Sequence, residues 1–147
     1  MNEPLKRSVR VRCPVDHAFA VFTDRIDLWW PSSHRMLTDS RLRMEARVGG
    51  RFFERTNAGD EKKLGEVVRW EPPHRVTYTW YPGAISAPTE VDVSFTPDGD
   101  FTVVDVTHAE GDSRLGEAWN QRVVKFASAW TEVLPAFVNY LASAAKE

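Results

Sequence analysis

One apolar stripe near the end of the chain constrains its fold more than any other feature. Seven apolar residues follow one another at intervals of four and three: Trp119, Val123, Phe126, Trp130, Val133, Phe137 and Tyr140. This spacing predicts one long helix from Arg114 to Ser143, with Ser113 as its N-cap. A helix of this kind gains most of its stability from packing, so its apolar face needs a partner.

The chain before this helix supplies the partner, because its apolar residues alternate with a period of two. Strands are predicted at residues 6–12, 41–46, 51–56, 63–70, 74–81, 89–96 and 101–108. Tight turns join most of these strands, so the sheet is predicted to be antiparallel. Two short helices follow the first strand: Val15–Thr23, capped by Asp16, and a second that is capped by Asp24 and ends near Trp29-Trp30.

These elements predict an α+β fold in one domain that covers residues 1–147. A curved antiparallel sheet of six to seven strands, wrapped on the long C-terminal helix, would bury both apolar faces. The two short helices would close one end. Because a wide sheet leaves space beside a single helix, we expect a ligand cavity between them.

Charge and cysteine content exclude several classes of partner. Lys and Arg number 19 and Asp and Glu number 21, a net charge of −2, and no basic block occurs. Nucleic acid is therefore not an expected partner. The single Cys13 cannot form an internal disulfide or a Cys-pair zinc site, and the four histidines lack metal-ligand spacing. We expect no metal.

Targeting and cofactor motifs are also missing from the sequence. There is no P-loop, no dinucleotide fingerprint and no nucleophile elbow, so no cofactor is expected. The polar N-terminus does not read as a secretory signal, and no stretch approaches the ~18 apolar residues of a membrane span. We expect a cytoplasmic protein without a membrane span.

Six motifs occur in order along nearly the whole chain. They are Trp29-Trp30-Pro31, Val48-Gly49-Gly50-Arg51-Phe52, Gly65-Glu66-Val67, Pro72-Pro73-His74-Arg75-Val76, the segment 102–108, and the late helix with Trp119 and Trp130. This order resembles the helix-grip (SRPBCC) superfamily, which includes birch-pollen-allergen-like and START lipid-transfer proteins. It is most similar to bacterial homologues of the C-terminal domain of the heat-shock-protein-90 ATPase activator. The resemblance implies a helix-grip fold; its members bind or process varied molecules.

Aromatic residues from four parts of the chain are the main candidates for a ligand site. They could line a pocket for a flat apolar or aromatic molecule, or they could fill the core completely. The predicted cavity residues are Trp29, Trp30, His34, Phe52, Glu66, Tyr78, Trp80, His108, Trp119, Val123, Phe126 and Trp130.

Polar groups among these candidates could carry chemistry. His108 shares its strand face with Val104 and Val106, where it could transfer a proton or serve as a structural hydrogen-bonding group. His34 could reach the cavity mouth or lie in a loop. Glu54 and Glu66 share parity with apolar neighbours, and an inward Glu66 beside His108 would form an acid/base pair. A bulge at the preceding glycine would instead turn Glu66 outward.

Three functions follow from these observations. The first is a small-molecule binding protein that holds an apolar or aromatic ligand and needs no cofactor. The second is a cofactor-independent cyclase, dehydratase or hydrolase that uses the same cavity. The third, implied by the resemblance, is an interaction module that stimulates a chaperone ATPase. A homodimer is possible, and a cavity above ~300 Å³ would favour the first two functions.

Overall fold

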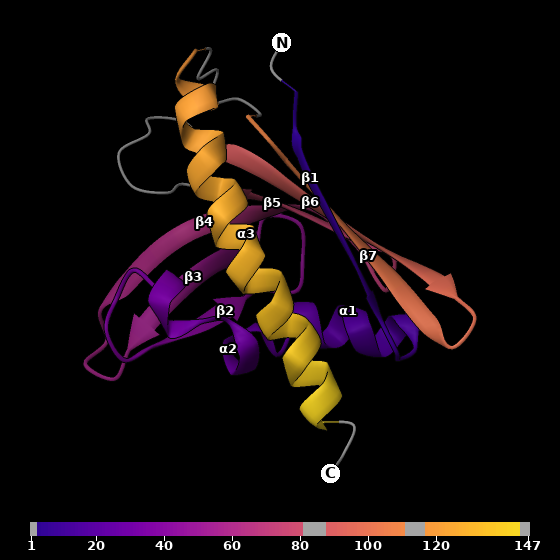
Figure 1. The fold of residues 1–147 in the computed structure, drawn as a ribbon. Coiled ribbons are helices and arrows are strands. Elements are labelled where there is room, and N and C mark those ends of the chain that lie inside the picture. Colours follow the sequence, from indigo (N-terminus) through magenta and orange to yellow (C-terminus); the bar gives the residue numbers. More distant parts are fainter. Residues whose placement is uncertain (1–2, 81–87, 111–116, 145–147) are drawn as a thin grey trace.

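The computed structural model describes residues 3–80, 88–110 and 117–144, and it has the predicted α+β helix-grip fold (Figure 1). Its elements are β1 (Leu5–Val11), α1 (Val15–Thr23), α2 (Ile26–Trp29), the 3-10 helix η1 (Ser32–His34), β2 (Ser40–Met44), β3 (Arg51–Thr56), β4 (Glu61–Glu71), β5 (Arg75–Trp80), β6 (Thr89–Asp98), β7 (Phe101–Ala109) and α3 (Glu117–Ala144). The predicted N-cap Ser113 and the predicted strand end Tyr81 lie outside the described residues.

The seven strands form one antiparallel sheet in the order β1-β7-β6-β5-β4-β3-β2. Figure 1 shows the sheet curving around α3, which crosses it, while α1 and α2 lie at one end. Registered pairs such as Val93 with Val106, and Tyr78 with Val91, place apolar side chains in rows on the face toward α3. The stripe of α3 packs on these rows: Trp119, Phe126, Trp130, Val133 and Phe137 are all buried. The hydrophobic core therefore lies between helix and sheet.

Strand β4 departs from simple alternation, and this overturns one prediction. Its register shifts once against β3 and once against β5, so Leu64 and Val67 are both buried although they are three positions apart and would lie on opposite faces of a regular strand. Glu66 between them points outward, with 46% of its side chain exposed and an ion pair to Lys63. The prediction of an inward Glu66 is wrong, because the bulges reverse its face.

The predicted side-chain caps of the two short helices are also wrong. Pro14 is the N-cap of α1, in an extended conformation, and its carbonyl accepts the N–H of Ala18. Asp16 lies one residue inside the helix, where a carboxylate still favours the positive end of the helix dipole. Asp24 follows the last residue of α1, and the N-cap of α2 is Arg25. The bounds of α1 itself agree with the prediction.

Candidate ligand-binding site

A pocket of about 280 Å³ lies between α3, the inner face of β5–β7 and the segment around η1. It is lined by Trp30, Ser33, His34, Arg35, Met36, Tyr78, Trp80, Val91, His108, Lys125, Phe126, Ala129, Trp130 and Val133. The volume lies just below the ~300 Å³ at which small-molecule pockets usually begin. Its wall is mainly apolar and includes the rings of three tryptophans, a tyrosine and a phenylalanine, whereas polar and charged groups come from η1, the residue after it and the exposed face of α3.

Seven of the twelve predicted cavity residues line this pocket: Trp30, His34, Tyr78, Trp80, His108, Phe126 and Trp130. The other five do not. Trp29 lies behind Trp30, and its indole N–H donates to the carbonyl of Val21 at 2.8 Å. Phe52 lies edge-on to Trp30 and Tyr78, also behind the wall. Glu66 points away from the pocket, as described above.

Trp119 and Val123, both on α3, complete the set of predicted residues outside the pocket. Trp119 packs against Phe126 and donates its indole N–H to the carbonyl of Glu3 at 3.0 Å. It therefore joins the start of the chain to the helix. Val123 is half-buried and packs against the core. These two side chains pack in the core and do not line the pocket.

Seven lining residues were not predicted: Ser33, Arg35, Met36, Val91, Lys125, Ala129 and Val133. Two of them carried a usable signal. Val133 belongs to the same helical stripe as Trp130, and Val91 has the strand parity of the buried Val93. The residues around η1 show no periodicity, so only their tertiary contacts place them at the pocket.

His108 has both ring nitrogens occupied within the protein. The indole N–H of Trp130 donates to Nδ1 at 3.2 Å, and Thr89 Oγ1 lies 2.9 Å from Nε2. An indole N–H can only donate, so Nδ1 is the acceptor and the proton of the neutral ring sits on Nε2, facing Thr89. The Thr89 hydroxyl in turn donates to the carbonyl of Trp80 at 3.1 Å. His108 is thus a wall residue, stacked on Phe126, without a free nitrogen for proton transfer.

Burial lowers the pKa of His108 from 6.5 to about 4, and we expect this to make the fold acid-sensitive. Between these two values the unfolded chain binds a proton that the folded chain does not, so stability rises with pH across this window. The histidine accounts for about 3 kcal/mol, lost progressively as pH falls from about 6.5 to 4. Urea unfolding at several pH values measures the slope. His108→Gln should lack this component, and an equal slope in both proteins would contradict it.

Tyr78 has a buried hydroxyl that makes no hydrogen bond within the described residues. The residue is 1% exposed, and burial raises the pKa of the phenol, so the group stays a neutral donor. Leaving a buried polar group unpaired costs about 1–3 kcal/mol. Tyr78 lines the pocket, and its hydroxyl, which neighbouring atoms cover, is a hydrogen-bond donor without an acceptor among the described residues.

Glu54 fixes the segment that closes the pocket. Its fully buried carboxylate accepts the N–H groups of Met36 and Leu37, at 2.7 and 2.9 Å, and the hydroxyl of Ser40 at 2.6 Å. Three hydrogen bonds to one carboxylate offset the cost of burying its charge. The prediction that Glu54 points inward and needs a partner is confirmed.

Arg35 also holds this segment in place, through hydrogen bonds of its guanidinium group. Its guanidinium donates to the carboxylate and the carbonyl of Asp27 and to the carbonyls of Trp30 and Ser40, all within 2.7–2.8 Å. A guanidinium has five donors, and four of these bonds are already made inside the protein. Arg35 therefore positions the mouth of the pocket rather than offering a free charge to a ligand.

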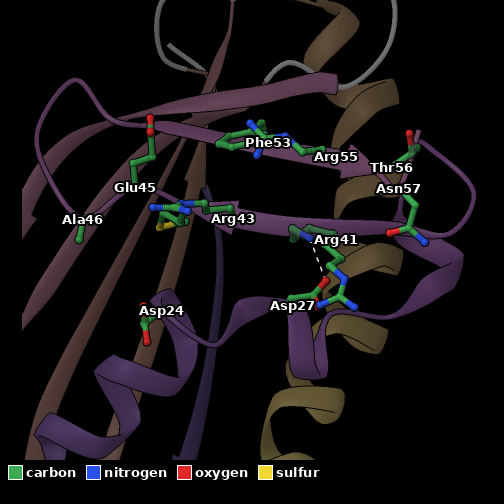
Figure 2. Close-up of a pocket in the computed structure, with 12 residues that line it drawn as sticks. Asp24, Asp27, Arg41, Arg43, Glu45, Ala46, Phe53, Arg55, Thr56 and Asn57 are labelled. Atoms are coloured by element: carbon green, nitrogen blue, oxygen red, sulfur yellow. Dashed lines mark hydrogen bonds between the residues drawn. The ribbon is translucent and has the colours of Figure 1, made fainter. Parts of the chain in front are cut away.

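A second, larger recess of about 550 Å³ lies beside the outer face of β2 and β3 (Figure 2). Its labelled lining is mostly charged or polar and includes Arg41, Arg43, Glu45 and Arg55. Asp27 covers the open edge of β2 by accepting the N–H of Leu42 at 2.8 Å. This open, charged groove does not suit an apolar ligand.

Residues 3–80, 88–110 and 117–144 contain no candidate metal centre and no candidate membrane-spanning helix. No group of three or more His, Cys, Asp and Glu side chains there could hold a metal ion. No helix in that part of the chain is long and apolar enough to cross a membrane.

The sequence matches the model of one protein family, described as activator of Hsp90 ATPase homolog 1-like protein, over residues 12–142. The chain belongs to this family. The match confirms the resemblance inferred from the order of the motifs. No curated protein matches the chain significantly.

Solved structures with the same fold include proteins of different activities. The anthrahydroquino-γ-pyrone synthase Txn09, solved in complex with SUM, is 32% identical, with a TM-score of 0.61 over 94% of this chain and 96% of Txn09. CalU16 from Micromonospora echinospora is 23% identical, with a TM-score of 0.68 over 94% of this chain and 73% of CalU16. PFC0360w, an HSP90 activator from Plasmodium falciparum, is 21% identical, with a TM-score of 0.56 over 74% of each chain.

Proposed function

We propose that this protein binds a flat, oxygen-bearing aromatic molecule in the pocket between α3 and β5–β7. The observation that carries the proposal is the unpaired hydroxyl of Tyr78, a residue that lines the pocket together with three tryptophans. On binding, the side chains that cover this hydroxyl would move aside and a carbonyl oxygen of the ligand would accept its hydrogen bond, while Trp30, Trp80 and Trp130 contact the rings of the ligand. The likeness to Txn09, whose name describes an oxygenated ring system, supports the same ligand class.

A ring-forming enzyme is a second candidate on the same pocket. The likeness to the synthase Txn09 favours this candidate, because the two chains are 32% identical and the match covers 96% of Txn09. The histidine predicted as its acid/base group, His108, does not suit that role, because both of its ring nitrogens are already bonded. Such an enzyme would need another proton acceptor at the pocket.

The chaperone-stimulating module has less support in the structure. Large exposed apolar side chains come from separate segments (Leu28, Met36, Val48, Val68 and Val124) rather than from one element. The structural likeness to PFC0360w, at 21% identity, concerns the fold. The predicted homodimer and the single-domain organisation stay predictions.

Tyr78→Phe separates binding from stability, because the two should change in opposite directions. Removing an unpaired buried hydroxyl should leave the free energy of unfolding unchanged or raise it by up to about 1 kcal/mol. Removing the donor to a ligand carbonyl should weaken binding about 5- to 20-fold. Quenching of tryptophan fluorescence by 9,10-anthraquinone measures the affinity, and urea unfolding measures the stability.

Anthracene, which has the same ring outline and no oxygen, is the matched control ligand. Its affinity should be equal for the wild-type protein and Tyr78→Phe. If both ligands bind both proteins with equal affinity, Tyr78 does not donate a hydrogen bond to the ligand oxygen. No measurable binding of either ligand would contradict the proposed function itself.

A further inference from the structure

His34 and Glu132 form a pair at the mouth of the pocket. His34 ends η1 and lines the pocket, and its Nε2 contacts a carboxylate oxygen of Glu132 on α3. The imidazole is half-buried, with 24% of its side chain exposed, whereas the carboxylate faces solvent. An ionised carboxylate can only accept, so Nε2 carries a proton, and in the neutral ring Nδ1 then carries the lone pair. No hydrogen bond to that Nδ1 is made within the described part of the chain.

We propose that the His34–Glu132 pair accepts the proton of an acidic phenol on the bound molecule. This inference rests on the proposed function. The phenol O–H bond breaks, its electron pair stays on the oxygen, and the proton binds Nδ1 of His34. The imidazolium that forms is held by the carboxylate of Glu132. No other reactant is needed.

The charged groups that face His34 support the transfer. Lys125 lines the same mouth from α3 and makes no ion pair within the described residues, so its ammonium can offset the charge of the phenolate. Arg35, the neighbour of His34 in the chain, is already bonded to Asp27. Glu132 then stabilises the imidazolium while Lys125 stabilises the phenolate, and the two new charges are each paired.

His34 differs from His108 in having a ring nitrogen that could accept a proton. His108 is 2% exposed, and its Nδ1 is bonded to Trp130. One nitrogen of His34 is oriented by a carboxylate, and the other has no partner among the described residues, which is the arrangement of a general base held in one tautomer. A phenolate attacks carbon more readily than its phenol, so this site would also supply the step that the second candidate function lacks.

The test uses 2-hydroxyanthraquinone, whose phenolate absorbs at longer wavelength than its phenol. The visible spectrum is recorded with saturating protein, one pH unit below the pKa of the free dye, where about a tenth of the dye is ionised. Binding to the wild-type protein should raise the ratio of phenolate to phenol about tenfold or more. His34→Gln should abolish this increase, and Glu132→Gln should reduce it.

His17→Gln is the matched control, because His17 is exposed on α1 and outside the pocket. It should keep the wild-type spectrum. A dye that binds and stays neutral, or a spectral change that survives in His34→Gln, would overturn the inference and leave the proposed function standing. If neither this dye nor 9,10-anthraquinone binds, the proposed function fails, and the inference fails with it.

Discussion

Replacing Glu54 with alanine is expected to lower the free energy of unfolding by about 3–5 kcal/mol. The substitution removes the acceptor of three hydrogen bonds, two from the backbone N–H groups of Met36 and Leu37 and one from the hydroxyl of Ser40. It also leaves a cavity, because the Glu54 side chain is fully buried. Urea unfolding followed by circular dichroism gives the difference.

The loss of Glu54 should also weaken ligand binding, because the segment it holds carries the pocket residue Met36. Glu66→Ala is the matched control: it removes a carboxylate from the next strand, where the side chain is half-exposed and its ion pair with Lys63 is 3.8 Å long. An exposed pair of this kind is worth about 0–1 kcal/mol. Similar losses of unfolding free energy in the two variants would show that the three hydrogen bonds of Glu54 do not stabilise the fold.

The fold could be predicted because periodicity records which face of each element is buried. The intervals of four and three in α3 predict an inward face, and the structure buries Trp119, Trp130 and Phe137 of that face. The alternation in β7 likewise puts Val104 and Val106 inside. Helix α1 and strand β3 have the predicted bounds, since a proline and a turn limit them.

The candidate site was less predictable, because it depends on departures from regularity. The bulges in β4 turn Glu66 outward. The sequence offered this outcome only as an alternative, because a glycine inside a strand marks a possible bulge without requiring one. The segment around η1 is held at the pocket by hydrogen bonds to Glu54 and Arg35. The bond to Glu54 joins residues far apart in the sequence, and Arg35 lies outside any periodic element. The pairing of His34 with Glu132 spans 98 positions, and no local pattern reports it.

Gly65→Ala is expected to lower the free energy of unfolding by at least about 3 kcal/mol, and the yield of folded protein should fall with it. A Cβ at Gly65 would lie 1.7 Å from the carbonyl oxygen of Thr79 in β5. Because that atom belongs to the backbone, no side-chain rotation relieves the contact, and β4 must separate from β5. Strand β5 also carries Tyr78, so the pocket should be lost together with stability.

Gly59→Ala is the control that isolates this close approach. Gly59 has φ +95° and nothing within 4 Å of the added Cβ, so its substitution introduces backbone strain without a clash, at about 1–2 kcal/mol. Urea unfolding and the yield of soluble protein compare the two variants. A Gly65→Ala protein as stable as Gly59→Ala would mean that β4 and β5 can separate at little cost. In that case Gly65 would not be the residue that sets the register of β4. The outward orientation of Glu66, which leaves the inner face to the pocket, would then have another cause.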